Sequence, residues 1–390
     1  MSSIKRSKLR SNPNLANHST YKNLRAQWHK KNHLNELDCF HTRDFTPDQF
    51  LKPLEFASRT NTSLNDACMT YRAQGIPCPS EETVLRQCRE EGSELMDIHI
   101  NHALEDQFDA LPSKLRRQYR KHGVVIIDFH TDPYYGMLDN PNVVVGPKKH
   151  GTHRFYSYLT ADLLTPRGQQ TIAVVHRRPG ETIYDLFWDL MTRVEFILTP
   201  KLLFFDGEFA TVQVLDSLHE KRYPYIARIK ISPRLQPLAL AYSLTDDWES
   251  KRTFRAITLL DKTKTVETTV HVTFQRVGKE MKALVISPLL DLTPKEAEQE
   301  YRKRFGIETG YRDKHLLQGR TTSKDMSVRL VLFLMACMLW NLWHTFLMLG
   351  PNPLKGTLTR VGIWRRRLRP INRLVLRDEL FSSGAGSSRR

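Results

Sequence analysis

The sequence predicts an α/β protein with a helical N-terminal domain, a core built on a mixed β-sheet, and a β-rich insertion in that core. In the middle of the chain, short continuous apolar runs alternate with amphipathic helical patterns, which is typical of buried strands and crossover helices. Helix-capping signals dominate before this region, and alternating Thr and Val follow it. With 390 residues, the chain is long enough for two or three domains.

These patterns divide the chain into six segments. They are a basic flexible arm (1–45), a helical domain (46–121), the first part of the core (122–231), the β-rich insertion (232–292), the C-terminal helices of the core (293–350) and a basic tail (351–390).

The charge of the chain favours a nucleic acid as its partner. The formal net charge is +17 and the pI is about 9.7. Each Lys or Arg that meets a phosphate releases a condensed counterion, so a surplus of this size favours a polyanion. Both ends are basic: residues 1–35 hold eight Lys and Arg and no acidic residue. The alternative is a protein that is merely basic, with solvated tails.

Cysteine usage and hydropathy bear on the compartment. The five cysteines show no C-x-x-C pair and no zinc-ligand spacing, and no signal peptide is recognised, which together predict free thiols in a reducing cytoplasm, at the nucleoid. Residues 330–350 are almost wholly apolar and long enough to cross a bilayer. They contain the polar residues Asn341 and His344, and the sequence has no second apolar segment of this length. We therefore expect a helix buried in the core and no association with a membrane, with a membrane span as the alternative.

The helical domain contains a candidate DNA-binding motif. Ser63 is placed to cap a helix, Gly75 to turn the chain, and Glu81 to lie in the first turn of a second helix that carries Arg86 and Arg89. Helix, glycine turn and helix are typical of a helix-turn-helix. An ordinary helical hairpin is the alternative. A basic helix at 104–121 is expected to link this domain to the core.

The core has the element order of a ribonuclease-H-like domain. Strands are predicted at 124–129, 142–146, 155–159, 171–176, 201–205 and 225–231, with helices from Thr182 and at 208–220. In that fold the strand that ends in Asp128 lies beside the strand that ends in Asp206. The two carboxylates are therefore expected to meet at one end of the sheet. We rank Asp132, which precedes a proline and suits a turn, and Glu208 below them.

A third acid is expected from a helix that follows the insertion. The sequence from Thr293 to Glu296 is a capping box that predicts a helix start. Tyr301, Arg304 and Glu308 share one face of that helix. Asp128, Asp206 and Glu308 would be oxygen ligands for a phosphoryl-transfer site with two Mg²⁺ ions, which Mn²⁺ could replace.

In this interpretation Arg304 holds a phosphate or the acid itself, and Tyr301 contacts the DNA backbone. The alternative is an amphipathic helix on which Arg304 and Glu308 form an i,i+4 pair at the surface.

The motif formed by Tyr301, Arg304 and Glu308 resembles the Y-x2-R-x3-E-x6-K signature of DDE transposases from bacterial and archaeal insertion sequences. The stretches IDFHTDPYYG (127–136) and FFDGEF (204–209) resemble the first and second aspartate motifs of that family. The resemblance covers roughly residues 50–350. It implies a ribonuclease-H-like core, dependence on Mg²⁺, and binding, cleavage and joining of DNA at the terminal inverted repeats and the target, with a dimer expected on DNA.

The sequence departs from the signature at one position, where His315 replaces the family lysine. In the family this lysine contacts terminal DNA, so His315, or Arg312 on the same helix face, is expected to take its place, while Lys314 points away. Two alternatives to a transposase remain open: a nuclease with the same core that does not join strands, and an inactive, transposase-derived DNA-binding protein.

Overall fold

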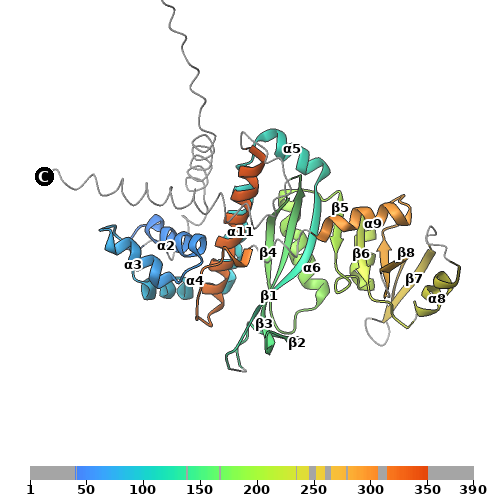
Figure 1. The fold of residues 1–390 in the computed structure, drawn as a ribbon, viewed down its shortest axis with the longest axis horizontal. Coiled ribbons are helices and arrows are strands. Elements are labelled where there is room, and N and C mark those ends of the chain that lie inside the picture. The colour runs from blue at the N-terminus through green and yellow to red at the C-terminus, as the bar shows by residue number, and fades with distance from the viewer. Residues whose placement is uncertain are drawn as a thin grey trace, which may run out of the picture.

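The computed structural model of the protein describes most of the chain between residues 40 and 349 (Figure 1). Described are residues 40, 42–137, 139–166, 168–233, 235–245, 252–259, 265–277, 280–305 and 314–349. The predicted site residues Glu308 and Arg312, the tail at 351–390 and most of the arm at 1–45 therefore lie outside the described residues.

The N-terminal helices pack around a long C-terminal helix. Helices α2 (Pro47–Thr60), α3 (Leu64–Ala73) and α4 (Glu81–Asp109) lie on one side of α11 (Met326–Leu349), and the sheet lies on the other (Figure 1). The Ser63 hydroxyl accepts a hydrogen bond from the backbone N–H of Asp66, which confirms the predicted cap of α3.

The helix-turn-helix assignment stays a prediction. Gly75 has a φ of +70° between α3 and α4, as the glycine turn requires. The two arginines expected on the second helix form exposed ion pairs within α4: Arg86 with Glu90 at 3.7 Å and Arg89 with Glu82 at 3.4 Å.

The predicted linking helix at 104–121 is wrong as a single element. Residues 104–109 belong to α4, and the chain breaks before α5 (Ser113–His122). Pro112 occupies the N-cap of α5 and has no N–H to continue the helix that precedes it. The basic residues of the predicted linker are thus carried mainly by the short helix α5, directly before the first strand.

Among the described residues, nine strands form one mixed sheet. They are β1 Val124–Pro133, β2 Val144–Lys149, β3 Thr152–Thr165, β4 Gly168–Arg177, β5 Leu202–Phe205, β6 Tyr225–Ile229, β7 Arg252–Leu259, β8 Thr265–Val277 and β9 Glu280–Ile286. The strand order is β2-β3-β1-β5-β6-β9-β8-β7, and β4 pairs with β3. An antiparallel meander followed by helix–strand units confirms the α/β fold with a ribonuclease-H-like core.

The register of the central strands places the two predicted aspartates. Strand β1 pairs in parallel with β5, and Ile127 is opposite Phe205. Asp128 and Asp206 are therefore the next residues on two neighbouring parallel strands, as the sequence predicted. The carboxyl ends of parallel strands form one edge of a sheet, and ligands commonly bind there in open α/β sheets.

The β-rich insertion extends the central sheet. Strand β9 pairs antiparallel with β6 and with β8, and β8 pairs with β7, so these strands continue the sheet beyond the core (Figure 1). Helix α8 (Gln236–Thr245) lies at the same end of the molecule. The insertion is thus β-rich, as predicted, and is hydrogen-bonded to the strand that follows Asp206.

Helices cover both faces of the core sheet. Successive residues of a strand point to opposite faces, and the central strands are apolar at successive positions, so both faces are apolar. One face of the sheet, including Val125 and Phe205, packs against α6 (Ile183–Ile197) and α7 (Val212–Glu220). The opposite face packs against α11 and α9 (Pro294–Arg302). Ile126 points to the face that packs against α9. Asp128 is two residues later in β1, so its side chain lies on the same face.

Helix α11 is the predicted apolar segment, and the structure confirms it as a core helix. It is long and apolar enough to span a membrane, but 94% of the most apolar window of Met326–Met348 is buried inside the protein. Its Asn341 is hydrogen-bonded to β4 at the bulge where the pairing register of β3 and β4 shifts. The Asn341 side chain accepts a hydrogen bond from the N–H of Thr171 at 2.8 Å and donates to its carbonyl at 2.7 Å and to Gln107 at 2.9 Å.

The variant Asn341→Leu should therefore be strongly destabilised. We expect a loss of about 1–3 kcal/mol in the free energy of unfolding for each backbone group of Thr171 left without a partner. Chemical denaturation measures this loss. The control is Met335→Leu, a buried volume-conserving change in the same helix that should cost less than about 1.5 kcal/mol. Equal transition midpoints for the two variants would contradict the role of Asn341.

Candidate functional site

Two carboxylates and one guanidinium form the centre of the candidate site. The Asp128 side chain at the end of the β1–β5 pairing accepts a hydrogen bond from Arg304 Nη2, with 2.9 Å between Nη2 and Oδ2. The same nitrogen lies 4.0 Å from Oδ2 of Asp206. Each aspartate also turns its Oδ1 to a backbone N–H of the next residue, Phe129 at 2.9 Å and Gly207 at 2.8 Å. The structure thus brings together three of the predicted site residues.

The two carboxylates differ in environment. The Asp128 side chain is 17% exposed and that of Asp206 is 54% exposed. Burial raises the pKa of Asp128, the charge of Arg304 lowers it and the charge of Asp206 raises it, and together these effects bring it to about 6. Burial therefore disfavours the ionised form of Asp128, and a cation beside it stabilises that form.

Arg304 lies directly after an α-helix that ends earlier than predicted. The capping box of Thr293 and Glu296 is present at the start of α9, as expected. After Arg302 the chain tightens into the 3₁₀ helix Lys303–Phe305, so the continuous α-helix expected through Glu308 is wrong at this point. Arg304 is 7% exposed, and the Cζ atom of its guanidinium lies 5.8 Å from the centre of the Tyr301 ring.

Tyr301 is part of the core beneath the site. Its side chain is fully buried, and its hydroxyl donates a hydrogen bond to the carbonyl of Phe205 at 3.3 Å. Its ring also packs edge-on against Phe204. This placement does not fit the predicted contact with DNA, because the phenol is not accessible. Tyr301 instead joins α9 to strand β5, whose last residue Phe205 precedes Asp206.

The donor set of the site suits a hard divalent cation. Carboxylate oxygens are the ligands that Mg²⁺ and Mn²⁺ prefer, and one oxygen of each aspartate lies within 4.0 Å of Arg304 Nη2. Asp128 and Asp206 could therefore hold such an ion in common. Glu308, the predicted third ligand, lies outside the described residues, as does Arg312.

Comparison with protein families matches residues 119–342, more than half of the chain, to the family described as "Transposase DDE domain". The chain belongs to this family. It is a DDE transposase, an enzyme of phosphoryl transfer, and enzymes of this class use divalent metal ions. A comparison with curated proteins gave no match.

Among solved structures, the transposase is similar to a piggyBac transposase described in a synaptic complex with hairpin DNA, determined by cryo-electron microscopy. The TM-score is 0.50 at 12% sequence identity, with 95% of this chain and 82% of that chain covered. At this identity the likeness concerns the fold, and it agrees with the ribonuclease-H-like core and the N-terminal helices described above.

The transposase places Lys314 and His315 in different surroundings, as the sequence predicted. Lys314 is buried and its ammonium lies 2.8 Å from Oδ1 of Asp162, which is itself fully buried on β3. The hydroxyls of Thr160 and Thr171 also donate to this carboxylate, at 3.1 and 2.6 Å. Lys314 thus acts as a structural cation.

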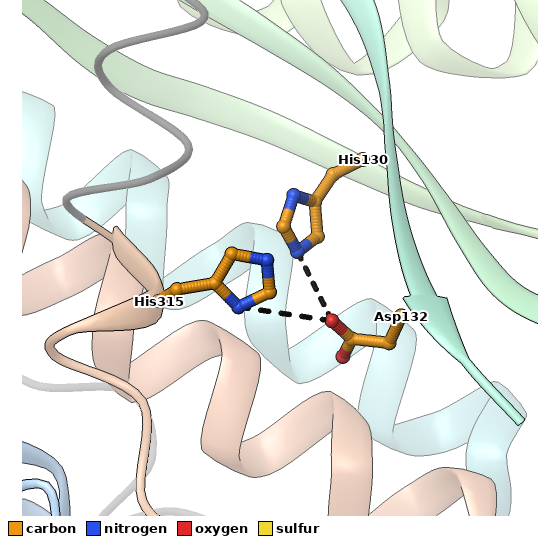
Figure 2. Close-up of side chains that lie close together, drawn as sticks. All are labelled: His130, Asp132 and His315. Carbon is orange, nitrogen blue, oxygen red and sulfur yellow. Dashed lines mark ion pairs between the residues drawn. The ribbon is translucent and has the colours of Figure 1, made fainter. Parts of the chain in front are cut away.

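His315 lies against strand β1, where its nearest charged partner is Asp132. Its side chain is 45% exposed, and its Nδ1 lies 3.9 Å from Oδ1 of Asp132 (Figure 2). His130 completes this group: its Nε2 lies 3.3 Å from the same oxygen. The exposure of His315 is compatible with the predicted contact to DNA, which stays a prediction.

Sequence reasoning missed this group of residues. Asp132 was expected to begin a turn, but β1 continues through Pro133 and carries Asp132 in a buried position. The signal was the period of the strand: Asp128, His130 and Asp132 alternate, so they share one face of β1. Glu208, ranked below the chosen acids, has an exposed side chain and pairs with Arg177 at 3.4 Å.

Removing the partner of Lys314 should destabilise the transposase. We expect Asp162→Asn to cost about 3–5 kcal/mol in the free energy of unfolding, because it leaves a buried ammonium without its carboxylate. Thermal or chemical denaturation measures the change. Adding Lys314→Met to that variant should recover part of the loss, and strictly additive effects of the two substitutions would show that the pair is not coupled.

Replacing Tyr301 distinguishes its position in the core from a contact with DNA. Tyr301→Phe should lower the free energy of unfolding by about 0.5–1.5 kcal/mol through the lost hydrogen bond to Phe205. The affinity for DNA, measured by fluorescence anisotropy at fixed salt, should stay within about twofold. A tenfold drop in DNA affinity with an unchanged free energy of unfolding would instead support the predicted contact of Tyr301 with DNA.

Proposed function

We propose that this DDE transposase is encoded by a bacterial or archaeal insertion sequence, cuts DNA at the ends of that element and joins those ends to target DNA. The observation that carries the proposal is the convergence of Asp128 and Asp206 on Arg304 at the end of two parallel strands. The resemblance of residues 301–308 to the Y-x2-R-x3-E motif supports assignment to the insertion-sequence group.

Asp128, Asp206 and Glu308 are the proposed ligands of two Mg²⁺ ions, with Mn²⁺ as a substitute. When bound, these ions would supply activation of the attacking water or 3′-hydroxyl and neutralisation of charge on the leaving oxygen. The protein holds Asp128 and Asp206 at fixed positions through the β1–β5 register and through the N–H groups of Phe129 and Gly207. The same carboxylates serve both reactions, because each is an attack on a phosphodiester.

Arg304 keeps the carboxylate pair in place. Two carboxylates at neighbouring strand ends repel each other, and the guanidinium compensates Asp128 directly and Asp206 at longer range. Arg304 lies over the ring of Tyr301, and the Tyr301 hydroxyl is hydrogen-bonded to the carbonyl before Asp206, so these contacts tie the position of the guanidinium to the strand end. Arg304 is therefore a positioning residue that can also offer donors to a scissile phosphate.

The partners follow from charge and from the reaction. A net charge of +17 favours DNA, and we assign the terminal inverted repeats and the target DNA as the two substrates. His315 and Arg312 are the proposed contacts to terminal DNA. Handling two element ends makes a dimer on DNA the proposed assembly, and the nucleoid of the cytoplasm the proposed location.

Substitution of the three acids tests the catalytic assignment. Asp128→Ala, Asp206→Ala and Glu308→Ala should each slow strand cleavage about a thousandfold or more, equivalent to about 4 kcal/mol in the activation barrier. Cleavage of DNA that carries the element ends is measured with and without Mg²⁺. The matched control is Glu208→Ala, an exposed acid two residues after Asp206, which should cut at near the parental rate. Retained cleavage in any of the three variants would remove that residue from the site.

A strand-transfer assay with pre-cut ends separates the proposed function from its two alternatives. A joined product supports the transposase with full activity. Cleavage without joining would point to a nuclease, and binding without Mg²⁺-dependent cleavage would point to an inactive DNA-binding protein.

A further inference from the structure

We propose that His130, Asp132 and His315 form a binding site for a divalent transition-metal ion, Zn²⁺ by preference, distinct from the site of Asp128 and Asp206. This inference goes beyond the proposed function, because it concerns a second site and can be tested without DNA.

The three side chains converge on a small volume. One potential ligand atom from each lies within 4.8 Å of the other two (Figure 2). His130 Nε2 and His315 Nδ1 both point at Oδ1 of Asp132, at 3.3 and 3.9 Å. Ligand atoms about 2.0–2.2 Å from a zinc ion are about 3.3–3.6 Å apart in a tetrahedral arrangement. The His130–Asp132 pair already has this spacing, and the half-exposed His315 side chain would rotate towards them to close the set.

The surroundings hold the ligands in place. The ring of His130 is buried and stacks on Phe333, with ring centres 4.9 Å apart and planes 14° from parallel. The second oxygen of Asp132 accepts a hydrogen bond from Gln318 Nε2 at 3.3 Å, which turns Oδ1 towards the histidines. Ligating carboxylates in proteins are typically hydrogen-bonded by a second group in this way.

The chemistry of the ligands selects the metal. Two imidazole nitrogens and one carboxylate suit Zn²⁺ and its neighbours among the transition metals, whereas Mg²⁺ prefers a set of oxygens. Three protein ligands leave a fourth position open for water or another oxygen. The exposed side of His315 gives that position access to solvent.

A bound ion would change both the charge and the connectivity at β1. Asp132 contributes a charge of −1 to this group when the histidines are neutral, and a divalent ion would reverse its sign. Asp132 is four residues along the strand from Asp128 on the same face, about 13 Å at the usual rise per residue. The ion would also join β1 to His315, which follows the third predicted acid by seven positions in the sequence.

Cobalt binding to the full chain tests the proposal. The protein is prepared without a polyhistidine tag and with Asp128→Asn and Asp206→Asn, so that the carboxylate site no longer binds. We expect one equivalent of Co²⁺ to give a visible d–d absorption band, and Zn²⁺ to displace it. In this background His315→Ala and Asp132→Asn should each weaken Co²⁺ binding by about 100-fold or more, and Gln318→Leu by about 10-fold, since outer-shell changes cost about 10–100-fold.

A histidine outside the cluster provides the control. His99 pairs with Glu91 at 3.1 Å on α4, a histidine–carboxylate pair that belongs to no three-ligand group among the described residues, and His99→Ala should leave Co²⁺ binding unchanged. Circular dichroism checks that each variant is folded. The absence of a stoichiometric band in the parent, or full binding by folded His315→Ala, would overturn the proposal, and neither outcome bears on cleavage by Asp128 and Asp206.

Discussion

The site depends on one charge arrangement, the guanidinium of Arg304 between two carboxylates of the same sign. Asp128 is largely buried and its pKa is raised, so its ionised form needs a cation close by. Arg304 supplies that cation from a segment 176 residues later in the chain. The ion pair therefore joins two parts of the fold that the β-rich insertion separates, and it acts together with the β1–β5 register in placing the two carboxylates.

The backbone around Asp206 is shaped for the same purpose. Tyr301 binds the carbonyl of Phe205, and Gly207 follows the aspartate directly. A Cβ atom at position 207 would lie 2.6 Å from the carbonyl oxygen of Arg228 on the neighbouring strand β6, so only glycine allows this close approach. The end of β5 thus lies between α9 and β6, and this packing determines the position of the Asp206 carboxylate.

The pairing of β1 with β5 and the meeting of Asp128 with Asp206 could be predicted, because apolar runs and their terminal acids are local signals and a ribonuclease-H-like topology places those two strands side by side. Other features could not. The burial of Tyr301 depends on its packing against β5, and helical periodicity reports neither this packing nor the change to a 3₁₀ helix at Lys303–Phe305. The group of His130, Asp132 and His315 needed the true end of β1, which Pro133 obscured as an apparent turn signal.

The hydrogen-bonded ladder between β9 and β6 has a consequence for how this enzyme can change during evolution. Deleting the inserted segment would strip β6 of a neighbour and leave its amide and carbonyl groups unpaired on an open edge, which invites aggregation. The segment can diversify at its distal hairpin of β7 and β8, but it cannot be discarded as a removable module. Its innermost strand has become part of the scaffold on which the chemistry is built.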